Sequence, residues 1–403
     1  MTHSIQKRVF ISALEASAEI HCANLIRAVN ERLGEYPENW PGSTENTPVK
    51  TDSQIDWVGF GGPAMEETGC TLIANTVSRA AMIYNVLTQL GYYNTLRKNA
   101  EVYLDEHSVD LVIVCDSPAF NFHIAKAARK RSIPVLFYVA PQLWAWAPWR
   151  IRKLRRCCTR LACILPFEKD WFTRRGIQTD FVGNPLFDEM TYQPDECYKQ
   201  YADFHTDSPK IALLPGSRKA EIKNLWPVMQ QVAQGLSAQH KKAVFFVSAP
   251  DTRRLEELKA AQTHPLPIEY TISDVFGTSR RCDLALVASG SATLQVAAAG
   301  CPMMILYQSS RLLWSLVGWW LIRTPYLSLV NILAGKELVP EFMPCLPPVK
   351  VIQDTCHSML LNKLNLIRTS GALVELTRPL ANGRASQNTA AIALDMLKIK
   401  TNE

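Results

Sequence analysis

The sequence predicts an α/β fold with two Rossmann-like domains. Short, continuous apolar runs recur along the chain, stretches with helical spacing separate them, and the whole series occurs twice, with a polar segment at residues 192–208 between the two series. Apolar runs without polar alternation are typical of strands that a parallel sheet buries on both faces. The length of 403 residues suits two domains of roughly 100–200 residues each.

The first domain is expected over residues 1–190. An apolar run at residues 9–13 leads into residues 17–33, where apolar positions recur at helical spacing, so a strand followed by a helix is predicted. Residues 34–54, rich in Pro, Asn, Thr and Ser, are typical of a surface insertion. Further strands, separated by basic helical stretches, are expected at residues 111–115, 135–138 and 161–165.

The second domain is expected over residues 191–384, beginning with the linker at residues 192–208. Its strongest apolar stretch, residues 312–322, has 11 residues, whereas a bilayer span needs roughly 20, so a core helix or an interfacial segment is predicted there. Strands are expected at residues 211–214, 244–247, 284–288 and 303–306.

The net charge of +6 is concentrated in one segment. Residues 117–167 contain ten Lys and Arg but no Asp or Glu, and the rest of the chain is net −4. A local positive charge indicates a local anionic partner. The 11 cysteines show no paired spacing, no His cluster accompanies them, and the N-terminus lacks the apolar run of a secretory signal. We therefore expect free thiols in a reducing, cytosolic compartment.

Ligands of open parallel sheets bind at the carboxyl ends of the strands, so the loops there are the candidate sites. In the second domain, Gly216, Ser217 and Arg218 follow one strand, and a small-residue loop at residues 289–293 follows another. Free amides at a helix start and a bidentate cation suit a pyrophosphate, although a plain turn remains the alternative for the first loop. Neither loop has the Walker A spacing, which disfavours phosphoryl transfer.

Carboxylates follow two strands of the first domain. Asp116 directly follows the apolar run at residues 111–115. At the end of a strand it can serve as a general base, with a helix N-cap as the alternative. Glu15, Ser17 and Glu19 follow the first strand and are expected at the same rim, where they too can be capping residues.

Three tryptophans precede a basic helix at residues 142–156. Aromatic residues beside Arg and Lys suit a membrane surface, an anionic lipid or a nucleic acid, with a packed Trp cluster and a solvated helix as the alternative. The charge is not accompanied by an RNP-type aromatic motif, which disfavours nucleic acid. Residues 80–93 form a second apolar candidate for membrane contact, with a core helix as the alternative.

The motifs resemble, in order and spacing over nearly the whole chain, those of the lipid-A-disaccharide synthase family. The most specific of them are the segments at 141–146 and 331–335. The matching segments are residues 15–19, 59–63 with 69–70, 116–121, 138–146, 165–168, 182–186, 214–218 with 221, 288–293 and 326–335. The resemblance implies a GT-B architecture, two Rossmann-like domains facing across a cleft, with residues 385–403 packing back toward the first domain.

The resemblance implies an inverting glycosyltransferase that needs no metal ion and no cofactor. It would transfer 2,3-diacylglucosamine from its UDP donor to the 6-hydroxyl of 2,3-diacylglucosamine 1-phosphate and release UDP. The implied location is cytoplasmic, peripherally associated with the inner face of the cytoplasmic membrane, whose anionic surface is a further partner. A homodimer is left open.

The resemblance also assigns roles to residues. Asp116, with Glu15 beside it, would act in catalysis and take the proton of the acceptor hydroxyl. Asn331 would hold the nucleotide through its amide, and the loop from Ser289 would hold the diphosphate. The substrate-binding residues expected are Ser17, Glu19, Asn121, Trp144, Gly216, Ser217, Arg218, Glu221, Ser289, Gly290, Ser291, Ala292, Thr293, Gln295 and Asn331.

The chain departs from the family pattern at several polar positions. The usual G-E-T-S-G-D loop is L-E-A-S-A-E here, and the usual Glu of the 288–295 segment is Gln295. These changes leave a second hypothesis open: a homologue with altered substrate or reduced activity that binds a UDP-sugar or a membrane lipid. The departures are Leu14, Ala18, Glu19, Ala119, Asn184 and Gln295.

Overall fold

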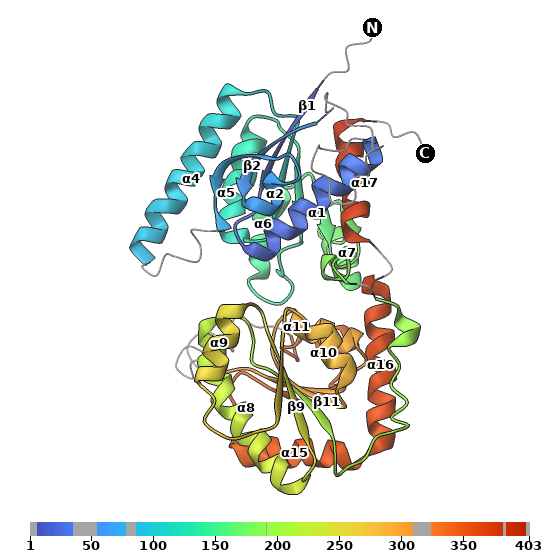
Figure 1. The fold of residues 1–403 in the computed structure, drawn as a ribbon. Coiled ribbons are helices and arrows are strands. Elements are labelled where there is room, and N and C mark those ends of the chain that lie inside the picture. Colours follow the sequence, from blue (N-terminus) through green and yellow to red (C-terminus); the bar gives the residue numbers. More distant parts are fainter. Residues whose placement is uncertain are drawn as a thin grey trace. The chain divides into compact units, whose positions relative to one another are not determined.

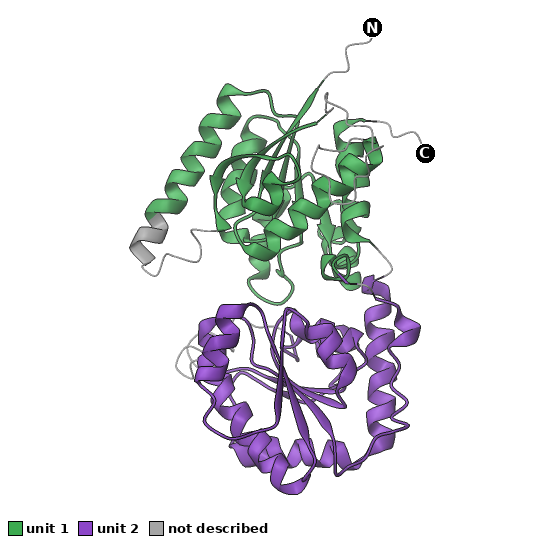
Figure 2. Ribbon diagram, in the orientation of Figure 1, with its two compact units in different colours: residues 1–189, 382–403 green, residues 190–381 purple. Residues whose placement is uncertain are grey.

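The computed structural model describes residues 6–34, 55–77, 86–190, 192–308, 324–381 and 384–399. These form two compact units (Figure 2). Unit 1 comprises residues 1–189 and 382–403, and unit 2 comprises residues 190–381. The sequence-based boundaries, after residues 190 and 384, lie close to these. Of the predicted insertion at 34–54, only Gly34 is described. The apolar stretch at 312–322 and residues 80–85 of the apolar segment at 80–93 lie outside what is described.

Unit 1 is built on a seven-stranded parallel sheet with the order β3-β2-β1-β4-β5-β6-β7. The central strands are wholly buried, as their continuous apolar sequences predict. The strands are β1 (Lys7–Ser12), β2 (Ile55–Gly61), β3 (Thr71–Asn75), β4 (Leu111–Cys115), β5 (Val135–Tyr138), β6 (Arg160–Cys163) and β7 (Thr179–Phe181).

Helices cover both faces of this sheet (Figure 1). Alternate side chains of a strand point to opposite faces. Ile11 accordingly packs in one cluster with residues of α1 and α17, whereas the ring of Phe137 meets Phe122 of α5 on the other side, 5.7 Å between centroids. The helices are α1 (Ala16–Leu33), α2 (Pro63–Glu66), α4 (Val86–Glu106), α5 (Pro118–Lys130), α6 (Ile151–Cys157), α7 (Pro166–Thr173) and α17 (Ala385–Leu397).

The C-terminal helix α17 belongs to unit 1, because it packs along α1 (Figure 1). The carboxylate of Asp188 accepts hydrogen bonds from the backbone N–H groups of Ala385 and Ser386, at 2.8 and 2.7 Å. Asp188 thus binds the free amides at the start of α17. At the other end of the helix, Arg160 of β6 pairs with Asp395.

Unit 2 is built on a six-stranded parallel sheet with the order β10-β9-β8-β11-β12-β13. The strands are β8 (Lys210–Leu214), β9 (Val244–Ala249), β10 (Ile268–Ile272), β11 (Leu284–Ala288), β12 (Met303–Leu306) and β13 (Glu341–Phe342). Helices α8 and α15 pack together, as do α11 and α16. The helices are α8 (Lys219–Gln239), α9 (Thr252–Ala260), α10 (Val275–Arg281), α11 (Ala292–Ala298), α14 (Leu329–Ala334), α15 (Val349–Leu361) and α16 (Lys363–Ala381).

Both sheets reverse their strand order at one point. In unit 1 the chain adds β2 and β3 on one side of β1 and then β4 on the other, and in unit 2 it adds β9 and β10 on one side of β8 and then β11 on the other. Connections leaving neighbouring strands in opposite directions open a crevice at the carboxyl ends, where ligands of such sheets bind. The topology therefore predicts sites after β1 and β4 and after β8 and β11.

Among the helices that the structure describes, none is long and apolar enough to cross a membrane. All 11 cysteines are free thiols, which agrees with the expectation from their spacing.

Candidate active site

The first candidate site lies at the carboxyl ends of β1 and β4. After Cys115, the last residue of β4, Asp116 and Ser117 adopt left-handed backbone conformations with φ of 49° and 40°. Such conformations cost non-glycine residues on the order of 1–3 kcal/mol each and concentrate at functional sites. Helix α5 begins at once with Pro118, and the Asp116 side chain remains exposed. The turn therefore presents a carboxylate at the edge of the sheet.

The side chain of Asn121 stabilises this turn through hydrogen bonds. Its side-chain Nδ2 donates to the carbonyl oxygens of Cys115 and Asp116, at 2.9 and 2.8 Å, and its Oδ1 accepts from the Ser12 hydroxyl at 2.8 Å. The residue is fully buried. Asn121 was expected to bind substrate, but the structure gives its side chain a supporting position: it ties the end of β1 to the strained turn after β4.

Glu15 meets the same turn from the neighbouring strand. The Ser117 hydroxyl donates to Glu15 Oε1 at 3.2 Å, so the loops after β1 and β4 are in contact. Glu15 and Ser17 are both exposed, at the start of α1. The structure thus brings together Glu15, Ser17 and Asp116, which the sequence placed at one rim.

Glu19 does not join this rim. It is 5% exposed, and its Oε1 accepts from the backbone N–H of Ala64 at 2.8 Å, in the first turn of α2. A carboxylate at a helix N-terminus is favourable because it binds free amides and the positive end of the helix dipole. The expected substrate contact of Glu19 is therefore replaced, in this structure, by a contact that fixes α2 to α1.

Apart from Glu19, the departures from the family pattern divide into two groups. Leu14 and Ala18 are buried, Ala18 inside helix α1, where alanine needs no special backbone conformation; Asn184 is buried and accepts from the Leu186 N–H at 3.1 Å. Ala119 is exposed in the first turn of α5, and Gln295 is partly exposed on α11. Only the second group leaves a changed side chain where a ligand can reach it.

Trp144, expected as a binding residue, is buried at 8% exposure. Its indole N–H donates to Glu168 Oε1 at 2.8 Å, while Glu168 Oε2 accepts from the backbone N–H groups of Ile164 and Leu165, at 3.2 and 3.0 Å. Burial raises the pKa of the Glu168 carboxyl to about 7, although these three hydrogen bonds favour the ionised form. Sequence reasoning assigned Glu168 no role. Pro166 and Glu168 at the start of α7 are typical of a capped helix N-terminus, but nothing in the neighbouring sequence indicates that Glu168 binds Trp144.

The loop that contains Trp144 begins next to Asp116. Tyr138, the last residue of β5, accepts a hydrogen bond from the Asp116 backbone N–H at 3.1 Å. Val139 and Ala147, at the two ends of the loop, have left-handed φ values of 42° and 52°. Glu168 therefore fixes the middle of a strained loop adjoining the candidate base.

Two tryptophans at the end of this loop and just after it reach solvent. Trp146 is 40% exposed and Trp149 is 56% exposed, and the Arg150 guanidinium lies 5.5 Å from the Trp146 ring. Of the three tryptophans at residues 142–156, Trp144 is buried, whereas Trp146 and Trp149 are exposed. The basic segment therefore has exposed aromatic side chains next to its cations.

The second candidate site lies after β8 and β11. Gly216 has φ of 98°, and a Cβ atom there would lie 3.2 Å from the Ala288 side chain at the end of β11 and 2.4 Å from a Glu221 oxygen. Glycine is needed at this position both for its backbone conformation and for the close approach of the two loops. The structure thus brings together the two small-residue loops that the sequence singled out.

Glu221 binds the amides expected to receive a diphosphate. Its Oε2 accepts from the backbone N–H groups of Ser217 and Arg218, both at 3.2 Å, and its Oε1 pairs with the Arg218 guanidinium at 3.0 Å. The Arg218 side chain is 78% exposed, and an exposed pair of this kind is worth only about 0–1 kcal/mol. Arg218 is therefore free to turn, whereas the two amides are already bound.

The loop after β11 is more open. Gly290 and Ser291 are exposed, with φ of 151° at Gly290, and Ala292 begins α11. Thr293 is buried and its hydroxyl donates to the Gly290 carbonyl at 2.7 Å; the Ser289 N–H donates to Leu306 at 3.0 Å. Thr293 and Ser289 shape the loop, and Gly290 and Ser291 offer its accessible backbone.

Asn331 lies in helix α14 and is fully buried. Its Nδ2 donates to the Val339 carbonyl and to Glu341 Oε2, both at 2.9 Å, and its Oδ1 accepts from the N–H groups of Leu338 and Val339, at 2.9 and 3.1 Å. The side-chain amide is saturated. The direct nucleotide contact implied by the resemblance would require one of these bonds to open. Glu341, which the sequence did not single out, also accepts from the Ser328 hydroxyl at 2.6 Å.

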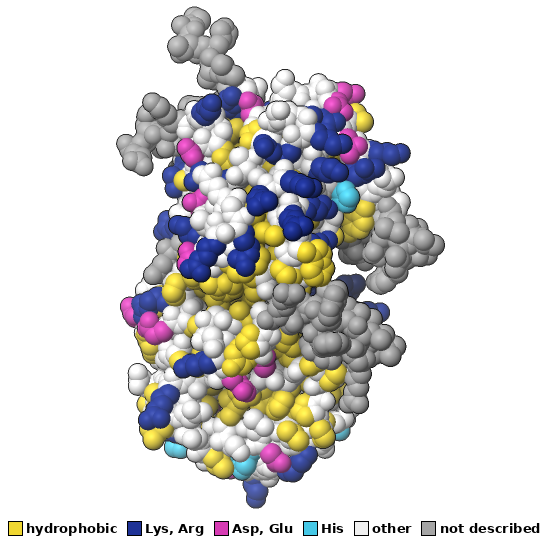
Figure 3. Space-filling view, turned by 180° about the vertical axis from the view of Figure 1, so that it is seen from behind, with side chains coloured by type: hydrophobic (Ala, Val, Ile, Leu, Met, Phe, Trp, Pro, Cys, Tyr) yellow, Lys and Arg dark blue, Asp and Glu magenta, His cyan; other side chains and the backbone are white. Residues whose placement is uncertain are grey.

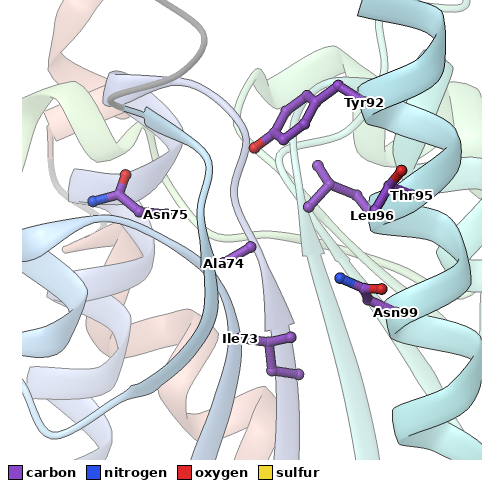
Figure 4. Close-up of a pocket in the computed structure, with 7 residues that line it drawn as sticks. All are labelled: Ile73, Ala74, Asn75, Tyr92, Thr95, Leu96 and Asn99. Carbon is purple, nitrogen blue, oxygen red and sulfur yellow. The ribbon is translucent and has the colours of Figure 1, made fainter.

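A pocket of about 630 Å³ lies in unit 1, between the outer strand β3 and helix α4 (Figure 4). Tyr92, Leu96 and Asn99 point into it from α4, opposite Ile73 and Ala74. It contains none of the residues expected to bind or react. Within the part of the chain that the structure describes, no three His, Cys, Asp or Glu side chains are grouped to hold a metal ion.

Two parallel, doubly wound sheets, each with polar loops at its reversal point, define a two-domain Rossmann-like protein of the GT-B type. Among solved structures, the chain is similar to an S. aureus MnaA–UDP co-structure (TM-score 0.60, 13% identity, 99% of this chain and 98% of that chain). It is also similar to a trehalose-6-phosphate synthase (TM-score 0.51, 13% identity, 98% and 100%). At such identities the likeness shows the fold alone.

Residues 9–390 match the family described as lipid-A-disaccharide synthetase. The chain is 31% identical to the lipid-A-disaccharide synthase of Geobacter sulfurreducens, over 98% of this chain and 99% of that protein, and 33% identical to that of Azotobacter vinelandii, over 83% and 85%. The chain therefore belongs to the lipid-A-disaccharide synthase family and is a glycosyltransferase. The resemblance seen in its motifs is confirmed.

Proposed function

We propose that the chain transfers 2,3-diacylglucosamine from UDP to the 6-hydroxyl of 2,3-diacylglucosamine 1-phosphate, with inversion at the sugar carbon. The acceptor oxygen forms a bond to C1 of the donor sugar, the bond from C1 to the UDP oxygen breaks, and the hydroxyl proton passes to the enzyme. The products are the disaccharide 1-phosphate and UDP. Family membership supports the substrate class, and the two candidate sites divide the chemistry between the units.

The observation that carries this proposal is the exposed carboxylate of Asp116 on a strained turn at the reversal point of the first sheet. A general base must be fixed within hydrogen-bond reach of the hydroxyl it deprotonates. Asn121 fixes the turn by hydrogen bonds to the carbonyl oxygens of Cys115 and Asp116, and the neighbouring Glu15 offers a second carboxylate to orient the acceptor. We assign the proton to Asp116 and the positioning of the acceptor to Glu15 and Ser17.

The leaving diphosphate is assigned to unit 2. Arg218, once it turns from Glu221, and the accessible backbone of Gly290 and Ser291 would stabilise the charge that develops on UDP. We propose that this cation and these amides replace a divalent metal ion. Turnover unchanged by a chelator such as EDTA is expected, and loss of turnover that Mg²⁺ restores would contradict the assignment.

The test is a UDP-release assay with the diacylated donor and acceptor, on Asp116→Asn. Turnover should fall by about 10²–10⁴, the usual contribution of a general base, while UDP still binds. Asp170→Asn, a matched change of an exposed carboxylate on α7 of the same unit, should turn over normally. Near-normal turnover of Asp116→Asn would remove Asp116 from the mechanism.

A second candidate function is a homologue that binds a UDP-sugar with altered or reduced transfer. Gln295 favours it, because the partly exposed Gln stands on α11 where the family has Glu. The same assay distinguishes the two functions. UDP binding without release of UDP from the diacylated donor would favour this second candidate.

We further propose peripheral association with the inner face of the cytoplasmic membrane, where acylated substrates are reached. The exposed Trp146 and Trp149 beside Arg150 support it, since Trp side chains favour the interface and cations favour anionic lipid. Co-sedimentation with anionic vesicles should weaken in high salt if charge dominates and persist if the aromatic residues dominate. No co-sedimentation in either condition would contradict the proposal.

A further inference from the structure

A groove between α4 and α5 of unit 1 collects cationic side chains outside both candidate sites. Its volume is about 220 Å³. In Figure 3, Lys and Arg side chains crowd one face of unit 1 with few acidic side chains among them. The polar side chains that line the groove are Arg97, Glu101, His123, Lys126, Lys130 and Arg131.

One wall of the groove is fixed. The Arg131 guanidinium donates through Nε and Nη2 to the Asp105 carboxylate, at 2.7 and 2.5 Å, and through Nη1 to the Ala127 carbonyl at 2.9 Å. Asp105 neutralises Arg131, and both hold the C-terminal end of α5 against α4. Arg131 therefore shapes the groove and is not available to a ligand.

The remaining cations exceed the acids beside them. Glu101 is the one acidic side chain of the lining, and it lies 3.6 Å from Arg97, its neighbour one turn away on α4. Lys126 and Lys130 are exposed one turn apart on α5, and no ion pair to either is found in the described part of the chain. The accessible lining thus carries a positive charge that Glu101 does not balance.

The cations also act on one another. Burial and the neighbouring Lys153, Arg97 and Lys126 lower the pKa of His123, so the imidazole stays neutral and can still donate one N–H. Lys130 lies in the last turn of α5, where a cation is favourable to the helix dipole in any case. Lys126 lies in the middle of the helix, where the helix dipole does not stabilise a cation. A substitution of Lys126 therefore tests ligand binding separately from stabilisation of the helix.

We propose that this groove binds a phosphate group, held by Lys126, Lys130 and Arg97. Charge-assisted hydrogen bonds from Lys and Arg are the usual protein contacts of phosphate oxygens, and His123 offers a neutral donor beside them. The volume equals that of about seven water molecules at about 30 Å³ each, enough for a phosphate with part of its hydration shell. The ligand is a free phosphate or phosphomonoester, or the headgroup of a phospholipid.

The groove shares no residue with either candidate site. Lys126 follows Ser117 by nine residues, most of them helical, so it lies about 12 Å further along α5 at 1.5 Å per residue. The proposal therefore does not rest on the assignment of Asp116, and its test does not use turnover.

The experiment uses the full chain, with calorimetric titration of inorganic phosphate and co-sedimentation with vesicles of phosphatidylglycerol or of phosphatidylcholine, all at one ionic strength. Lys126→Glu is compared with Lys98→Glu, an equal charge change at an exposed α4 position that does not line the groove. Saturable binding should weaken at least about tenfold in Lys126→Glu and little in Lys98→Glu.

The pattern of losses identifies the source. Loss of phosphate binding in Lys126→Glu supports a small phosphate ligand, and selective loss of phosphatidylglycerol vesicles supports a lipid headgroup. Equal behaviour of the two variants in both assays would overturn the proposal, since it would show diffuse charge rather than a site. Circular dichroism checks folding, and Lys126→Gln replaces Lys126→Glu if the latter does not fold.

Discussion

The two candidate sites start from similar loops at equivalent points of their sheets, but they hold their polar groups in opposite ways. In unit 1, buried Asn121 binds the turn from behind and leaves the Asp116 carboxylate exposed. In unit 2, the Glu221 carboxylate occupies the Ser217 and Arg218 amides themselves. The turn of the first site is held by a side chain that leaves its carboxylate free, whereas two amides of the second site are already bound to an internal carboxylate.

The two sites therefore differ in the free energy that ligand binding would have to supply. The strain at Asp116 and Ser117 is already offset by the fold, so on the proposed function the acceptor need not supply it. On the proposed function, the accessible backbone of Gly290 and Ser291 can receive the diphosphate directly, whereas the Ser217 and Arg218 amides can do so only by losing Glu221, which keeps them satisfied when no ligand is bound.

The largest effect is expected from removing the Asn121 side chain, which supports the turn of the first site. Asn121→Ala removes all three side-chain hydrogen bonds of a buried residue and leaves two carbonyl oxygens and the Ser12 hydroxyl without their partner. We expect a loss of about 2–5 kcal/mol in the free energy of unfolding, measured by denaturant titration, and a fall in turnover of about 10² or more.

Ser12→Ala is the matched control for Asn121→Ala, because it removes only the bond to Oδ1. It should cost about 1 kcal/mol and leave turnover within a few fold of normal. Equal stability of Asn121→Ala and the parent chain would show that the turn does not depend on Asn121.

The next effect concerns the loop beside the first site. The pKa of Glu168 is about 7, raised by burial, so the folded chain keeps this proton while the unfolded chain loses it near pH 4.5. The folded state then binds more protons, and its stability falls as pH rises from about 4.5 to 7, by on the order of 3 kcal/mol from this group.

Glu168→Gln cannot titrate, so the difference in unfolding free energy between the two chains should change with pH. Relative to the parent, the variant should become more stable on going from pH 5 to pH 8, in denaturant titrations at both values. Trp fluorescence reports the Trp144 contact in the same samples. A pH-independent difference would show that Glu168 is ionised throughout.

The fold was predictable where strands are continuous and aliphatic, such as β4 and β11, because burial on both faces leaves no polar alternation. Strand β2 was not predicted. It contains Asp56 and two glycines, and Gly59 is required because a Cβ there would lie 1.8 Å from the Ile11 carbonyl of β1. That close approach is a property of the sheet and leaves no periodic signal in the sequence. Strand β13 has only two residues.

At the sites, the sequence placed the loops correctly but not the partners of their side chains. Glu15, Asp116, Gly216 and Ser291 come from loops at strand ends, which topology brings together. The hydrogen bonds of Glu19 with Ala64 and of Trp144 with Glu168 join segments 45 and 24 residues apart. Spacing cannot distinguish a polar residue facing a ligand from one satisfied by a distant backbone group.

A smaller effect tests the second site directly. Glu221→Ala removes the carboxylate that competes for the Ser217 and Arg218 amides. We expect UDP to bind more tightly, by about 1 kcal/mol or about fivefold in calorimetric titration, and the helix α8 start to lose about 1 kcal/mol of stability. Weaker binding of UDP would show instead that Glu221 holds the loop in its binding conformation.

The smallest effect distinguishes the two candidate functions. Gln295→Glu restores the family's carboxylate on α11, at a partly exposed position next to the accessible loop of Gly290 and Ser291. The hypothesis tested is that the family's Glu at this position accepts hydrogen bonds from the ribose hydroxyls of the donor. A charged acceptor binds a ribose hydroxyl more strongly than an amide does, so the donor should bind about threefold more tightly, which is less than about 1 kcal/mol. Unchanged donor affinity would place Gln295 outside the ribose site. A tighter complex with unchanged turnover would show that Gln295 does not limit transfer.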